Sequence, residues 1–212
     1  MSDESAAASA DENGSQEAVV SPDEVVLTAD DAPAGYVAED FYGIFGSSDS
    51  GNSGTITPQE CAPFVFDTSV LLDWGAQPRD TTAVGYFTGD DGSSVMVHVD
   101  TATDGAEAPD PTLCGDVTRE NASTLGTTVT SYGMVPADVG VEGADSVAAV
   151  DLTVSGLTLD GEEFNVGSKV GERSQIITAT VGSTVVTVAG TEPASMDTVA
   201  EVANAQVARL VE

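Results

Sequence analysis

The sequence predicts an α+β domain in which an antiparallel sheet of five or six strands packs with two helices. Apolar residues alternate with polar ones in several segments of the chain, which is the pattern of half-buried strands. Short turns that contain glycine join these segments, and two other segments have apolar residues at helical spacing. Consecutive strands joined by turns, with helices at either end, favour an antiparallel sheet over a parallel one.

The first 22 residues differ in composition from the rest of the chain. They are mainly Ser, Ala, Asp, Glu and Gly, and residues 1–40 contain eleven acids and no Lys or Arg. Such a segment buries too little apolar surface to offset the entropy lost on ordering it. We therefore predict a disordered acidic tether over 1–22 and a single domain over 23–212, a length that suits one domain.

The first predicted helix covers 57–74. Thr57 stands at the N-cap, Pro58 at the first helical position and Glu60 three residues after the cap, which is the pattern of a capping box. Pro63 disturbs this pattern because proline lacks a backbone N–H group. A kinked helix, or one that begins only after Pro63, is therefore also consistent with the sequence.

The predicted strands follow from alternation of period two. Residues 82–88 and 95–99 alternate on either side of a Gly-Asp-Asp-Gly turn, which predicts a β-hairpin. Further strands are predicted over 127–134, 146–159, 174–181 and 184–189. The second predicted helix covers 195–211, with an acid in its first turn and Arg209 in its last, where each suits the helix dipole.

The charge balance excludes several classes of partner. The chain has 36 Asp and Glu against five Lys and Arg, a net charge of −31. Nucleic acid is excluded because its phosphates need neutralising cations, and an anionic membrane surface is disfavoured for the same reason. Hydrophobic residues make up 41%, which is enough for a core, but no apolar run approaches the ~20 residues of a spanning helix.

No motif in the sequence identifies a reaction. The chain has one histidine, His98, and neither a nucleophile elbow nor a phosphate-binding loop. His98 alternates with Val97 and Val99, so we expect it on the opposite face from the valines and partly exposed. We predict no catalytic residue, no metal site and no cofactor.

The two cysteines, Cys61 and Cys114, bear on the compartment. An even number in a small domain fits one disulfide in an oxidising compartment, and two unrelated buried thiols are the alternative. An acidic Ser- and Ala-rich start is typical of linkers between a membrane anchor and a folded envelope domain. We therefore expect export to the cell envelope, at the outer face of the cytoplasmic membrane or as a secreted protein.

Three short segments resemble a known family. They are LTADDAPAGY at 27–36, TPQECA at 57–62, and the strand pair over 173–188 with the helix that follows it. These segments resemble actinobacterial cell-envelope lipoproteins and the PknH-like extracellular sensor domain, and the resemblance spans roughly 25–212. It implies an antiparallel sheet with helices and an apolar-walled cleft that binds a ligand, without catalytic residues. The family usually has more cysteines, so only the pair Cys61–Cys114 carries over.

Together these observations predict a non-enzymatic, exported, monomeric protein with a groove for a small or lipidic ligand or for an envelope protein. Membrane contact would occur only through an N-terminal anchor that has been removed. The candidate groove residues are Tyr86, Phe87, Tyr132, Met134, Arg119 and Arg173. Ordinary core packing and surface ion pairs are the alternative interpretations of these residues.

Three other functions remain open at this stage. The chain fits a structural or assembly subunit of an envelope complex without a small-molecule site. It also fits a halophilic cytoplasmic protein, since such proteins are rich in acids and poor in lysine. A carboxylate-based hydrolase is the third, and it would need two acids about 5–9.5 Å apart in a cleft.

Overall fold

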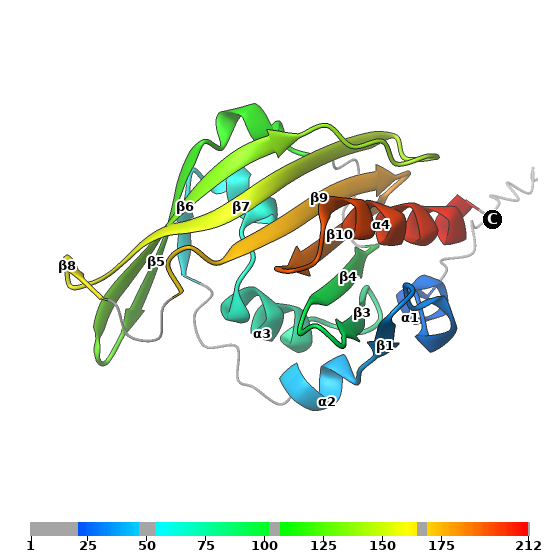
Figure 1. Ribbon diagram of the computed structural model, residues 1–212, viewed down its shortest axis with the longest axis horizontal. Coiled ribbons are helices and arrows are strands. Elements are labelled where there is room, and N and C mark those ends of the chain that lie inside the picture. The colour runs from blue at the N-terminus through cyan, green and yellow to red at the C-terminus, as the bar shows by residue number, and fades with distance from the viewer. Residues whose placement is uncertain (1–20, 47–53, 102–106, 165–168, 212) are drawn as a thin grey trace, which may run out of the picture.

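The computed structural model describes residues 21–46, 54–101, 107–164 and 169–211. The predicted tether over 1–22 therefore lies almost wholly outside the described residues. The described chain forms one mixed α and β structure around a ten-stranded sheet in which every strand pair is antiparallel (Figure 1). The predicted antiparallel class is confirmed, but the prediction of five or six strands is wrong.

The sheet has the strand order β1-β3-β4-β10-β9-β7-β6-β5-β2, and β8 pairs with β7 outside this path. The strands are β1 (Tyr36–Ala38), β2 (Thr55–Thr57), β3 (Thr82–Gly89), β4 (Ser94–Asp100), β5 (Asp116–Ser123), β6 (Gly126–Ala137), β7 (Ser146–Leu159), β8 (Glu162–Glu163), β9 (Arg173–Val181) and β10 (Thr184–Thr191). The helices are α1 (Pro22–Val25), α2 (Phe41–Phe45), α3 (Thr68–Ala76) and α4 (Met196–Val211), with the 3₁₀ turns η1 (Ala29–Asp31), η2 (Gln59–Phe64) and η3 (Pro111–Leu113).

The strands that the sequence did not predict are β1, β2, β5 and β8. Three of them have at most three residues, too few to show alternation. β5 is longer, but its inward positions include Arg119, so polar residues interrupt the apolar pattern. Pairing with β6 along the whole of β5, from Asp116 opposite Gly133 to Ser123 opposite Gly126, makes this segment a strand.

The predicted helix over 57–74 divides into three elements. Thr57 ends β2, a 3₁₀ turn follows over Gln59–Phe64, and the α-helix begins only at Thr68. The capping box predicted at Thr57 is therefore wrong, and the later start is correct. Pro63 explains the break because it cannot donate a helical hydrogen bond. Asp67 is the true N-cap, and its carboxylate accepts from the backbone N–H groups of the first turn.

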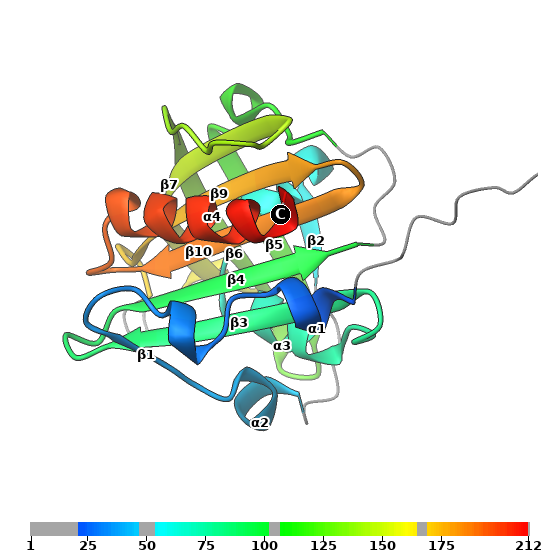
Figure 2. The ribbon, with the colours of Figure 1, turned by 90° about the vertical axis from the view of Figure 1, so that its right-hand side faces the viewer.

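Each face of the sheet has its own core. α4 lies across β9 and β10, as Figure 2 shows, and with α1 it covers one face. Gly190 in β10 permits this close approach, because a Cβ atom there would lie 2.5 Å from Val199 of α4. The predicted helix over 195–211 is confirmed as α4. On the other face, η2, α3 and α2 pack over an aromatic-rich core.

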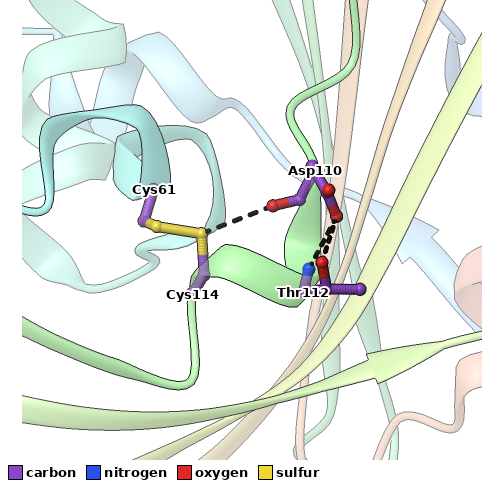
Figure 3. Close-up of a disulfide and its surroundings, with 4 residues drawn as sticks. All are labelled: Cys61, Asp110, Thr112 and Cys114. Carbon is purple, nitrogen blue, oxygen red and sulfur yellow. Dashed lines mark hydrogen bonds between the residues drawn. A yellow bond between two sulfur atoms is a disulfide. The ribbon is translucent and has the colours of Figure 1, made fainter.

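A disulfide joins Cys61 of η2 to Cys114, directly after η3 (Figure 3). Both residues are fully buried, and their Cα atoms are 5.7 Å apart. The predicted disulfide is thus present, and it indicates an oxidising, extracytoplasmic environment. Among the described residues, no helix has both the length and the apolar character needed to cross a membrane.

His98 differs from the expectation of partial exposure. It lies on the opposite face from its neighbouring valines, as alternation predicts, but it is only 6% exposed. α3 covers this face, and the Trp74 ring stacks on the imidazole with 4.7 Å between ring centroids. Nε2 of His98 lies 2.7 Å from Oε1 of Gln77. A strand pattern reveals which face a side chain occupies but not whether a helix covers that face.

Candidate functional site

A cavity of about 400 Å³ lies between α3 and the strands β6, β7 and β9, and we call it the first cavity. Its apolar lining residues are Phe66, Leu71, Leu152, Val154, Leu157 and Phe164. Its polar lining residues are Asp67, Thr68, Ser69, Asn121, Thr128, Thr130, Tyr132, Lys169, Glu172, Ser174 and Thr191.

A register shift in the sheet shapes this cavity. Tyr132 pairs with Val154, whereas Thr130 pairs with Leu157, so β7 has one extra residue between the two pairs. In a regular strand, residues 154 and 157 would point to opposite faces. The bulge turns both side chains toward the first cavity.

A buried ionic network forms one side of the first cavity. Arg119 is 1% exposed, and its Nη1 donates to Oδ1 of Asp67 over 2.7 Å. The Tyr132 hydroxyl donates to Oδ2 of the same carboxylate over 2.8 Å. Oδ1 of Asp67 also accepts from the backbone of Ser69 and Val70 in the first turn of α3. One carboxylate therefore connects β5, β6 and α3.

The protonation of Tyr132 follows from its surroundings. Burial raises the pKa of its hydroxyl well above the usual value of 10, and the negative charge of Asp67 raises it further. The hydroxyl therefore stays protonated at neutral pH and remains the donor to Asp67. Burial also raises the pKa of Asp73, which lies on α3, although the nearby charge of Arg119 acts in the opposite direction.

A second cavity, of about 520 Å³, lies beside the same guanidinium group. Arg119 lines it directly, and Asp73 Oδ2 stands 3.8 Å from Arg119 Nη2. The other lining residues are Gly54, Thr55, Ile56, Gln59, Ala62, Val70, Trp74 and Gln77. The second cavity therefore lies between the short edge strand β2, the η2 turn and α3.

The predicted groove residues do not line a single groove. Tyr132 lines the first cavity and Arg119 the second, and Asp67 connects them. Met134 is buried in the core on the same face. Ligand binding by these residues stays a prediction.

The other three predicted residues lie elsewhere. Tyr86 packs near α2, with its ring centroid 6.4 Å from that of Phe41. Phe87 is fully buried in the core that α1 and α4 cover, on the opposite face of the sheet. Arg173 is exposed at the start of β9. None of the three lines either cavity.

Sequence reasoning missed Asp67 and Asn121. Asp67 carries a signal that could have revealed it, because an aspartate after Pro63 and before an apolar run is a typical N-cap. Asn121 carries none, since its position depends on the pairing of β5 with β6. Its side-chain oxygen is buried and has no hydrogen-bond partner among the described residues.

Comparisons with known proteins identify no family. No family model matches the chain, and no curated protein matches it. One solved structure is similar, an X-ray structure of an uncharacterized protein from Mycobacterium smegmatis described as the Rv0999 ortholog. The two chains are 13% identical with a TM-score of 0.44, and the match covers 84% of this chain and 86% of that one.

Proposed function

We propose that this protein is a non-enzymatic, exported cell-envelope protein that binds a small or lipidic ligand in the first cavity. The observation that carries this proposal is a cavity of about 400 Å³ in which an apolar strand surface meets a fixed polar network. Small-molecule sites in proteins typically measure ~300–1,000 Å³ and combine apolar walls with a few polar groups.

The disulfide and the charge support export. A disulfide is stable outside the cytosol, and the structure has one between two fully buried cysteines. A net charge of −31 keeps the domain away from anionic lipid surfaces, in keeping with a domain that works beside a membrane without lying on it.

The lining residues support a mainly apolar ligand with one polar end. Leu152, Val154 and Leu157 present a continuous apolar surface from β7. The carboxylate of Asp67 and the hydroxyl of Tyr132 are held in place by the network, so they are preorganised to meet a polar group. Burial of the apolar part would contribute ~25 cal/mol per Å².

The same network favours binding over hydrolysis. Asp67 and Glu172 both line the first cavity, so a carboxylate pair is available in principle. Both oxygens of Asp67, however, already accept hydrogen bonds from Arg119, Tyr132 and the start of α3. A carboxylate held in this way is suited to positioning a neighbour rather than to transferring a proton.

A neutral fluorescent probe tests the proposal. N-phenyl-1-naphthylamine should bind the full chain with one site per molecule and gain fluorescence. Leu157→Trp should abolish this signal by filling the first cavity. Leu125→Trp is the matched control, because Leu125 is 85% exposed and lines neither cavity. The proposal fails if the probe does not bind, or if the two variants bind it equally well.

The remaining hypotheses predict different results. An assembly subunit without a small-molecule site would leave the probe unbound, and a halophilic cytoplasmic protein would unfold in low salt. The finer proposal, a PknH-like sensor domain, rests on the three sequence segments described above. It predicts that ligand binding in the first cavity is the activity of the domain.

A further inference from the structure

Arg119, which lines the second cavity, has one edge whose hydrogen-bonding capacity is not filled among the described residues. Nη1 of Arg119 bonds to Asp67, but Nε has no hydrogen-bond partner among the described residues. Nη2 lies 3.8 Å from Asp73, which is beyond hydrogen-bond distance. Nε and Nη2 lie on one edge of the planar guanidinium and point the same way, so together they form a two-donor fork.

This fork adjoins the second cavity. Arg119 and Asp73 both line it, and Asp73 stands beside Nη2. A buried N–H group without a partner is costly, at ~1–3 kcal/mol and more for a charged group. An acceptor that enters the second cavity would therefore gain more binding free energy from Nε and Nη2 of Arg119 than from a donor that is already bonded within the fold.

The charges around the fork decide which acceptor fits. One guanidinium is shared by two carboxylates, Asp67 and Asp73, and the whole chain has a net charge of −31. An anion would meet the negative charge of Asp73 and the negative field of the whole chain. A neutral hydroxyl avoids this repulsion, because it can accept from Arg119 and donate to Asp73 at once.

We propose that the second cavity binds a neutral sugar through two adjacent hydroxyl groups. Their oxygens would accept from Nε and Nη2 of Arg119, and one of them would donate to Asp73. Gln59 supplies a further donor and acceptor, and Gln77 supplies its amide N–H groups, since its oxygen already lies 2.7 Å from Nε2 of His98. Trp74 forms part of an apolar wall for the C–H face of the ring. This inference is independent of ligand binding in the first cavity.

Trp74 offers a direct measurement, because it is the only tryptophan in the chain and it lines the second cavity. Methyl α-D-glucopyranoside, methyl α-D-mannopyranoside, methyl β-D-galactopyranoside and methyl α-D-arabinofuranoside are titrated into the full chain, with sodium acetate as the anionic comparison. At least one glycoside should change the Trp74 emission saturably, and acetate should not.

Three variants locate the effect. Asp73→Ala should weaken glycoside binding about tenfold or more, as expected for a lost hydrogen bond to a charged group. Ala62→Leu should abolish binding by filling the second cavity. Ala34→Leu is the matched control on an exposed residue that lines neither cavity. Urea unfolding and naphthylamine binding verify that each variant is folded and that the first cavity is intact.

Each contrary result overturns the inference. It fails if no glycoside changes the emission, or if acetate binds and the glycosides do not. It also fails if Ala62→Leu binds as well as Ala34→Leu. The naphthylamine result is unaffected by any of these, so failure here is distinguishable from failure of the proposed function.

Discussion

His98 should make a separable contribution to the loss of stability of this protein in acid. The imidazole is 6% exposed, stacked on Trp74 and adjacent to the side-chain oxygen of Gln77. Burial lowers the pKa of His98 from 6.5 to about 4, and the charge of Asp100 opposes this only in part. The folded protein therefore keeps His98 neutral in a pH range where the unfolded chain protonates it.

The size and sign of the effect follow from this difference in pKa. Between pH 6.5 and about pH 4 the unfolded chain binds a proton that the folded protein does not, so stability falls as the pH falls. Each tenfold difference in proton affinity corresponds to ~1.4 kcal/mol, which gives a loss of roughly 3 kcal/mol across this range. Above pH 6.5 this group contributes no pH dependence.

Urea unfolding followed by Trp74 emission measures the loss, between about pH 7 and about pH 4.5. His98→Gln is the reference variant, because an amide can still donate to Gln77 but does not titrate in this range. The carboxylates titrate in both proteins, so the difference between their unfolding free energies isolates His98. A difference that stays constant across the pH range would refute the buried, neutral imidazole.

Two further predictions concern stability. Replacing Cys61 and Cys114 together by Ser should lower the unfolding free energy by about 4 kcal/mol, which is the chain-entropy value for a loop closed over 53 residues. Urea unfolding measures this loss, and a loss below ~1 kcal/mol would contradict the prediction. Gln206→Leu should cost about 2–4 kcal/mol, because the buried amide accepts from the backbone N–H of Leu27 over 3.0 Å and donates to the carbonyl of Val25, the last residue of α1, over 2.9 Å. Compared with Gln206→Leu, Gln206→Glu should recover only the hydrogen bond that the side-chain oxygen accepts from the backbone N–H of Leu27.

The sequence predicted the parts of the fold that local patterns control. The hairpin over 82–99, the helix over 195–211 and the pairing of Cys61 with Cys114 each depend on alternation, helical spacing or cysteine number. The capping signal at Thr57 places the start of the helix over 57–74 too early, because Pro63 interrupts the segment and the α-helix begins only at Thr68.

The cavities depend on contacts that local patterns do not record. The bulge beside Tyr132 brings Leu157 to the inward face. Gly156 lies at this bulge, and a glycine inside a strand pattern is a signal for one, but the pattern does not show which neighbouring side chains the bulge turns inward. Arg119 lines the second cavity and bonds to Asp67 in the wall of the first, and the same residue interrupts the apolar alternation of β5 by which that strand would be recognised. The candidate site thus lies where the simple pattern of the sequence fails, as is common at functional sites.

The burial of Arg119 is itself an argument for a ligand. Desolvating a charged pair offsets most of its attraction, so apolar side chains of similar volume often stabilise a core equally well or better. Arg119 also leaves Nε without a partner among the described residues, which adds to the cost. Packing alone therefore does not account for a guanidinium that bonds to Asp67 through Nη1 and has Asp73 3.8 Å from Nη2 at the wall of the second cavity. A ligand that accepts from the unused edge does account for it.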